Sequence, residues 1–118
     1  MIQRFTIQGR LIGYNDLKSH WRDSWKLKKS EMERIGWEAK RAGIKPVSGK
    51  VEISIKCYEP NARRDVDNVY SGACKVVLDA LQACGILKGD GQKYVEKVSG
   101  SVTVDKKNPR VEVTISEV

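Results

Sequence analysis

The segment from Val51 to Tyr58 alternates apolar and polar side chains almost without fault, and no other feature of the chain constrains its fold as strongly. An alternation with a period of two predicts a β-strand that buries one face. Such a face needs a second layer of structure to cover it. The predicted strand ends at Glu59–Asn61 and leads the chain directly into the charged segment Arg63–Asn68.

The N-terminal part of the chain predicts another strand and a long helix. Residues 2–12 carry apolar anchors that predict a strand, which Gly9 interrupts, and residues 13–16 predict a turn or loop. Residues 21–42 contain no proline and are rich in long, straight-chain side chains, which favours a helix. The apolar residues of this helix recur at helical spacing and predict its buried face: Trp25, Met32, Ile35, Ala39 and Ala42.

The other side chains of this helix have two interpretations. Lys26, Lys28 and Lys29 either contact the phosphates of a nucleic acid or form an ordinary solvated face. Trp21 and Trp25 either belong to the core or stack on unpaired bases, as aromatic side chains do at distorted DNA. The sequence alone leaves both alternatives open.

A second helix is expected from Asp67 or Asn68, both good N-cap residues, to Cys84, with Gly85 in the usual C-terminal position. Its core stripe is formed by Val69, Ala73, Val76, Ala80 and Leu81.

The last part of the chain predicts a β-hairpin. Tyr94–Val104 and Arg110–Ile115 both alternate, and the connection between them carries Lys106 and Lys107 at a basic tip. The predicted order is therefore β-α-β-α-β-β. It indicates an α+β fold, in which a single mixed β-sheet is packed by two main helices.

Length and composition limit the class of protein. A chain of 118 residues is long enough for one core, so we expect a single domain over residues 1–118. A formal charge of +7 favours a polyanionic partner. Three cysteines without C-x-x-C spacing indicate neither a disulfide framework nor a zinc site. No apolar run has the length of a membrane span or a signal peptide, so we expect no membrane contact and a cytoplasmic location.

Three aspartates at the two ends of the second helix are candidate metal ligands. Asp65 and Asp67 are separated by one residue, so in an extended chain both side chains project to the same side. Asp90 follows the helix. Carboxylates are the ligands that Mg²⁺ prefers. Each aspartate also has a structural interpretation, as a helix cap or a turn residue, but Arg63 and Arg64 beside the pair favour a site that binds a phosphodiester.

The segment RRDVDN, followed by a helix with the pattern K-x-x-x-D-A-L and then by G-x-L-x-x-D-x-Q, resembles the RusA family of Holliday junction resolvases. These are small endonucleases, often encoded by prophages. The resemblance covers roughly residues 63–94 and is compatible with the order of elements over the whole chain. It implies a RusA-like endonuclease domain whose catalytic aspartates are Asp65, Asp67 and Asp90.

Two departures from the family pattern concern this site. Gly89 precedes Asp90, where family members often have a second acidic residue. The lysine that the family commonly places one turn after D-x-D-N is Ser71 here, and Lys75 lies one turn further along. Lys75 is thus either the catalytic lysine or an ion-pair partner of Asp79, four residues away.

The resemblance and the residues together predict a crossover-junction endodeoxyribonuclease that acts in DNA recombination and repair. We expect Asp65, Asp67 and Asp90 to hold Mg²⁺, with Mn²⁺ as an alternative ion, and a homodimer to bind branched, four-way DNA. The basic residues expected to bind DNA are Arg63, Arg64, Lys26, Lys28, Lys29, Lys106 and Lys107. The alternatives are a non-catalytic nucleic-acid-binding module and a metal-dependent nuclease that acts on forks or flaps.

Overall fold

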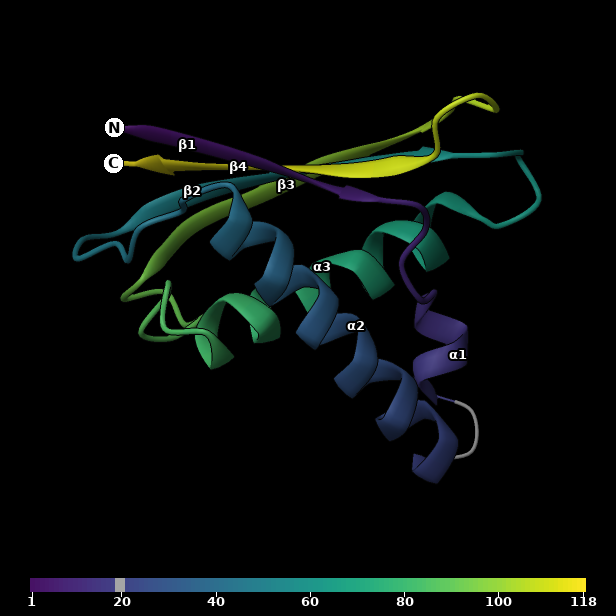
Figure 1. The fold of residues 1–118 in the computed structure, drawn as a ribbon, viewed down its shortest axis with the longest axis horizontal. Coiled ribbons are helices and arrows are strands. Elements are labelled where there is room, and N and C mark those ends of the chain that lie inside the picture. The colour runs from purple at the N-terminus through teal and green to yellow at the C-terminus, as the bar shows by residue number, and fades with distance from the viewer. Residues whose placement is uncertain (19–20) are drawn as a thin grey trace.

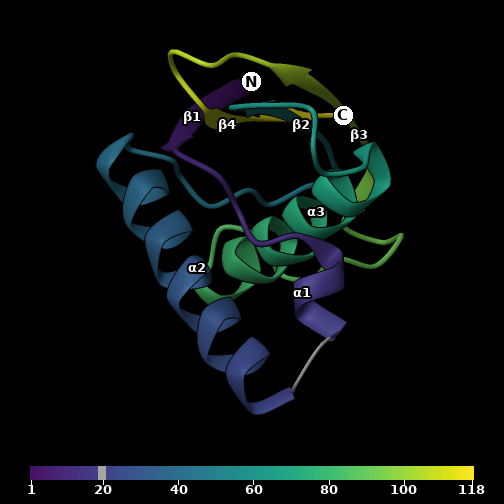
Figure 2. The same ribbon diagram turned by 90° about the vertical axis from the view of Figure 1, so that its right-hand side faces the viewer.

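The alternating segment is strand β2 (Val51–Glu59), and it lies inside a four-stranded mixed sheet. The computed structural model describes the backbone of residues 1–18 and 21–118 and the side chains of residues 1–17 and 24–118. Helices cover one face of the sheet and leave the other face open (Figures 1 and 2). The remaining elements are β1 (Ile2–Gln8), α1 (Tyr14–Lys18), α2 (Trp21–Arg41), α3 (Val66–Ala83), β3 (Val95–Val104) and β4 (Arg110–Glu117).

The strands are arranged in the order β1-β4-β2-β3. β2 and β3 are parallel and joined by α3, whereas β4 is antiparallel to both β1 and β2. The α+β fold with a single mixed sheet is confirmed. The predicted hairpin of β3 with β4 is wrong, because β2 lies between these two strands. A helical crossover returns the chain parallel to β2, and β4 then fills the interior position between β1 and β2.

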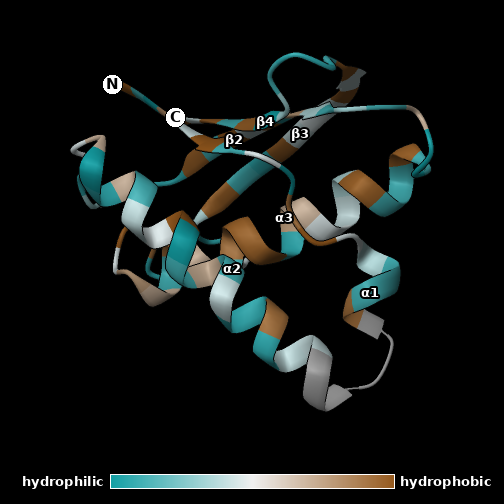
Figure 3. Cartoon of the chain, turned by 45° about the vertical axis from the view of Figure 1, so that its right-hand side comes forward, coloured by the Kyte–Doolittle hydropathy of each residue, from teal (hydrophilic) through white to brown (hydrophobic). Residues whose placement is uncertain are grey.

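The core lies between the sheet and the two long helices. β2 buries every second residue, and β4 does the same with Val111, Val113 and Ile115. α3 contributes a wide buried face, whereas α2 carries more hydrophilic residues (Figure 3). All five residues predicted for the core stripe of α3 are buried: Val69, Ala73, Val76, Ala80 and Leu81.

α2 begins and ends close to the predicted bounds, but its buried face is narrower than predicted. Ile35 and Ala39 are buried and Met32 is partly buried. Trp25 is 61% exposed and Ala42 is also exposed, so their predicted places in the core are wrong. The first turns of α2 extend past the edge of the other elements (Figure 1). The side chain of Trp21 lies outside the described residues.

Two local features differ from the sequence-based expectations. Residues 14–18 form the short helix α1 where a loop was predicted. α3 begins at Val66 with Asp65 as its N-cap, earlier than the predicted start at Asp67 or Asn68. At the other end, Gly85 has the left-handed φ of 82° that a helix terminus favours, as predicted. Within the described residues, no helix is long and apolar enough to cross a bilayer.

The cysteines Cys57, Cys74 and Cys84 are all free. Cys57 is buried, Cys74 is half-buried and Cys84 is exposed. Burial raises the pKa of the Cys57 thiol to about 12, so this thiol stays protonated and behaves as a small apolar side chain.

Candidate active site

The carboxylates Asp65 and Asp67 lie where β2 has ended and α3 begins. Asp65 is the N-cap residue in extended conformation, with φ −64° and ψ 149°, and its side chain forms no capping hydrogen bond. Asp67 lies in the first turn of α3. The two residues therefore straddle the helix start, instead of sharing one side of an extended chain as predicted. Both are exposed at the N-terminal end of α3.

Glu59 anchors the loop that carries these aspartates. It is the last residue of β2 and only 3% exposed. Arg64 binds it with two hydrogen bonds of 2.9 Å, from Nε to Oε1 and from Nη2 to Oε2, and Arg10 Nη2 donates to Oε1 at 2.8 Å. Burial alone would raise the pKa of Glu59, but the hydrogen bonds from Arg64 and Arg10 outweigh burial and lower it. The carboxylate is thus ionised at neutral pH.

The sequence analysis did not identify Glu59 or Arg10 as part of this region. The alternation of β2 could have identified Glu59, because position 59 continues the series of side chains that face the core. The earlier members of this series are Val51, Ile53, Ile55 and Cys57. A glutamate at an inward position needs cationic partners. Arg64 is one of them, and it also donates from Nη1 to the carbonyl of Leu11 at 3.0 Å. The predicted contact of Arg64 with DNA stays a prediction beside this observed role.

Asn68 attaches the N-terminal segment to the start of α3. Its Oδ1 accepts a hydrogen bond of 2.7 Å from the backbone N–H of Asn15. A Cβ on Gly13 would lie 2.9 Å from the Asn68 side chain, and a Cβ on Gly72 would lie 2.3 Å from the carbonyl oxygen of Ile12. Only glycine permits these close approaches. Residues 12–15 therefore brace the first turns of α3, which carry Asp67.

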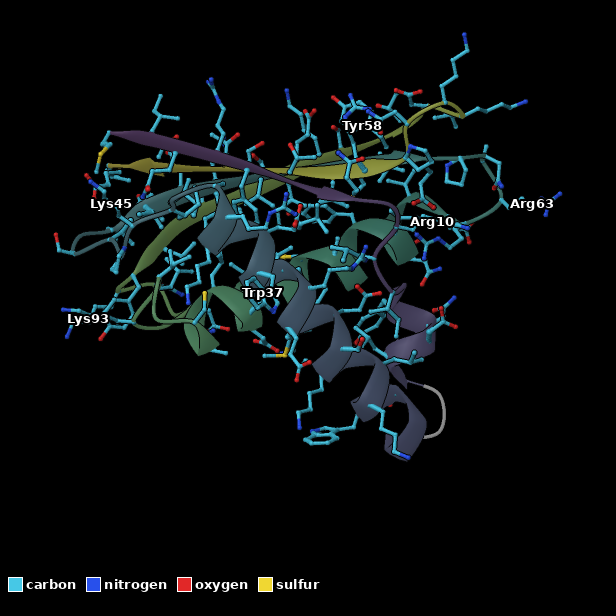
Figure 4. All side chains as sticks on the ribbon, viewed as in Figure 1. Arg10, Trp37, Lys45, Tyr58, Arg63 and Lys93 are labelled. Carbon is cyan, nitrogen blue, oxygen red and sulfur yellow. The ribbon has the colours of Figure 1, made fainter. Side chains whose placement is uncertain are left out.

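Asp90 lies at the opposite end of the molecule. β3 begins at Val95, paired with Val51 at the start of β2, whereas Asp65 follows the end of β2. The 18 residues of α3 separate the two ends by about 27 Å. Figure 4 shows the same separation through Arg63, near Asp65 in sequence, and Lys93, near Asp90. In the described part of the chain, no three His, Cys, Asp or Glu side chains form a group that could hold a metal ion.

Lys75 points to a partner on its own helix. Its Nζ lies 3.6 Å from Oδ2 of Asp79, and the same oxygen lies 2.6 Å from Nζ of Lys28 on α2. The Lys75 side chain is 55% exposed and lies about 12 Å along the helix from Asp67. The ion pair with Asp79, one of the two interpretations of the K-x-x-x-D pattern, is therefore present.

The other predicted DNA-binding residues are distributed over two exposed regions. Lys29 lies over the ring of Trp25, with its Nζ 5.4 Å from the ring centroid, and Lys26 is exposed nearby. Arg63 is exposed in the loop before Asp65, as Figure 4 shows. Lys106 and Lys107 are exposed in the connection that leads from β3 to β4. Positive side chains are thus displayed at the same end of β2 as Asp65 and along the start of α2.

A comparison with protein families shows the family to which this chain belongs. A family model described as Endodeoxyribonuclease RusA matches residues 23–116 of the 118. The chain belongs to the RusA endodeoxyribonuclease family. A search of curated proteins found no match.

Membership in the RusA family makes the protein an endodeoxyribonuclease, a hydrolase that acts on DNA. The family implies Holliday junction resolvase activity on branched DNA, in recombination and repair. Nucleases of this kind generally depend on a divalent metal. Asp65 and Asp67 fit such an ion, because both present hard oxygen donors to solvent and the Asp65 carboxylate is not used to cap α3.

Proposed function

We propose that this RusA-family protein is a Mg²⁺-dependent, structure-specific endodeoxyribonuclease that resolves four-way junctions, with Asp65, Asp67 and Asp90 as its metal ligands. The observation that carries the proposal is the Asp65 side chain, which makes no capping hydrogen bond at an N-cap position where aspartate normally makes one. Asp67 adds a second carboxylate in the first turn of α3. Mn²⁺ would serve as an alternative ion, and the cytoplasmic location expected from the sequence stays a prediction.

The third carboxylate must come from a second copy of the chain. Asp90 and the pair Asp65 and Asp67 lie at opposite ends of α3, so one ion cannot bind all three within one subunit. In a two-fold symmetric homodimer, Asp90 of each subunit can approach the pair of the other. Such a dimer has two equal composite sites. A four-way junction has two equivalent scissile positions, which matches this symmetry.

Each protein group has a defined task in the proposed reaction. A bound Mg²⁺ ion supplies polarisation of the phosphoryl group and a lowered pKa of its bound water. Asp65 and Asp67 fix the position of the ion relative to the phosphodiester. Arg63 and Lys75 supply positive charge for the phosphate as negative charge develops on it. Glu59, through Arg64, keeps the loop before Asp65 in place.

DNA affinity is proposed to come from exposed basic residues away from the scissile bond. Lys26 and Lys29 on α2, together with Lys106 and Lys107, would contact backbone phosphates without reading sequence. Lys28 forms an ion pair with Asp79. It would have to leave this partner in order to contact a DNA phosphate. Binding should weaken steeply as salt rises, because phosphate contacts release counterions.

One experiment tests the proposed activity against its alternatives. Purified protein and its Asp67→Asn variant are incubated with a four-way junction, a fork and a linear duplex, with and without Mg²⁺. We expect paired, symmetric cuts in the junction that require both Mg²⁺ and Asp67. Preferred cutting of the fork would assign a different branched substrate. Binding by both proteins without any cleavage would show a non-catalytic DNA-binding module and overturn the proposal.

A further inference from the structure

The helices cover one face of the sheet, and the other face is open (Figures 1 and 2). The covered face is apolar, because Phe5 and Ile7 on β1 and Val111 and Val113 on β4 are buried. The residues that alternate with them point to the open face. There the strands present mainly hydroxyl and charged side chains, and an apolar partner would have to desolvate these groups. The open face is therefore suited to a charged, hydrated partner.

A hollow of about 480 Å³ lies on the open face of β1, β4 and β2. The register of the strands arranges its side chains in two adjacent cross-strand rows. The first row is Arg4, Thr114 and Ser54, and the second is Thr6, Glu112 and Lys56. One cation thus lies on the β1 side of the hollow and another on the β2 side, with hydroxyl groups between them.

The two cations of the hollow are available to a ligand. Glu112 lies directly across from Lys56, an arrangement in which opposite charges stabilise each other. The Glu112 carboxylate instead accepts a hydrogen bond of 3.0 Å from Nε of Arg110. Among the residues that the structure describes, neither Arg4 nor Lys56 forms an ion pair. Both side chains are exposed, so an anion can bind them without breaking an existing pair.

The spacing of these cations fits a phosphate group. Arg4 and Lys56 lie two strands apart and one row apart, which corresponds to about 12 Å between their Cα atoms. Both side chains are long enough to converge on the space between them. The hydroxyl groups of Thr6, Ser54 and Thr114 are additional hydrogen-bond donors. Arginine, lysine, serine and threonine are side chains with which proteins contact DNA phosphates.

The open face favours the backbone of duplex DNA over unpaired bases. Surfaces that bind single strands stack the bases on aromatic side chains. Tyr58 is the aromatic residue that β2 presents beside the hollow (Figure 4). The guanidinium of Arg110 already stacks on its ring, 3.8 Å from the ring centroid. The contacts that this face offers are therefore phosphate contacts, which do not read sequence.

We propose that the open face of the sheet binds the backbone of one duplex arm of branched DNA, with Arg4 and Lys56 as its phosphate contacts. The branched substrate rests on the proposed function. Lys26 and Lys29, the contacts proposed for DNA on α2, belong to the helical layer on the other side of the sheet. The sheet therefore separates two basic surfaces of the same chain.

Two separate surfaces favour branched DNA over linear DNA. A duplex is stiff over about 500 Å, far more than the 37 Å length of the protein, so a linear duplex follows one face at a time. The arms of a four-way junction leave in different directions, and two of them can contact the two faces together. The open face thus contributes to the preference for junctions.

Substitution of the two cations tests this surface. Arg4→Gln, Lys56→Gln and the double variant are compared with the wild type in equilibrium binding to a four-way junction and to a linear duplex, without metal. The double variant should lose about tenfold in affinity for the junction and about twofold for the duplex, which can still bind α2. The slope of log affinity against log salt concentration should fall by about two for the junction, about one for each cation. The control is Lys45→Gln, which removes the same charge at an exposed position far from Tyr58 and Arg63 (Figure 4) and should leave both affinities unchanged.

Thermal unfolding confirms that each variant folds. A double variant that binds the junction as tightly as Lys45→Gln does would overturn the proposed surface. Equal losses of affinity for the junction and the duplex would also overturn it, because the open face would then bind DNA in general and not a second arm. Variants that respond as expected, in a protein that cuts no junction, would retain the surface and refute only the proposed function.

Discussion

Arg64 and Glu59 form a two-point ion pair at the end of β2, with both donor–acceptor distances at 2.9 Å. Arg10 completes the cluster from the segment after β1 (Figure 4). The pair joins the last residue of a buried strand to the residue next to Asp65. The position of the candidate metal ligand is thus coupled to the stability of the sheet.

Replacing Glu59 with alanine should lower the free energy of unfolding by about 3 kcal/mol, because it leaves two arginines beside a buried site without their carboxylate. Glu112→Ala is the control, since Glu112 also pairs with an arginine but at the surface, where about 1 kcal/mol or less is expected. Urea denaturation of the three proteins measures the difference. If both variants lost the same free energy of unfolding, the buried cluster would stabilise the fold no more than the surface ion pair does.

Glu59 should also make the free energy of unfolding depend on pH in the acid range. The pKa of Glu59 is lower in the folded protein than its ordinary value of 4.5, so its contribution is fully present above that value. It is lost as the pH falls through the folded pKa. The stability difference between wild type and Glu59→Gln should therefore be constant from neutral pH down to about 4.5 and shrink below it. A difference that grew with acid would contradict this sign.

The composite site predicts complementation between two inactive variants. In a mixed dimer of Asp67→Asn and Asp90→Asn chains, one site receives both substitutions and the other receives neither. Mixing the two proteins should therefore restore cleavage, with one strand of the junction cut per heterodimer. If each site were built within one chain, every site would carry one substitution and the mixture would stay inactive. Gel analysis of end-labelled junctions distinguishes these outcomes.

Lys75→Ala separates the two roles of this lysine. Lys75 is exposed and Asp79 keeps its ion pair with Lys28, so the loss of stability should not exceed about 0.5 kcal/mol. If Lys75 supplies charge to the phosphate, single-turnover cleavage should fall by at least about tenfold. Lys28→Ala removes the other partner of Asp79 and serves as the control for the loss of stability alone. Cleavage at the wild-type rate would leave Lys75 as a structural residue only.

The sequence by itself determined the elements that depend on local periodicity. Val51–Tyr58 alternates, and it is a strand; residues 21–42 and 67–84 repeat at helical spacing, and they are α2 and α3 within two residues. The ordered motif from Arg63 onward also indicated the RusA family, which the match over residues 23–116 confirmed. These features could be predicted from the sequence because backbone preference and side-chain spacing depend only on residues that are close together in the chain.

Only the tertiary structure decided which distant residues lie together. β4 took the position between β1 and β2, which no alternation pattern could reveal, since a pattern reports that a strand has an inner face but not which strand lies beside it. Trp25 is exposed although its helical spacing predicted a buried place, because periodicity cannot tell which residues of a stripe another element covers. Glu59 became the centre of an arginine cluster because its strand position faces the core. The length of α3 placed Asp90 far from Asp65 and Asp67, because a helix of 18 residues is a rigid rod whose ends cannot approach each other.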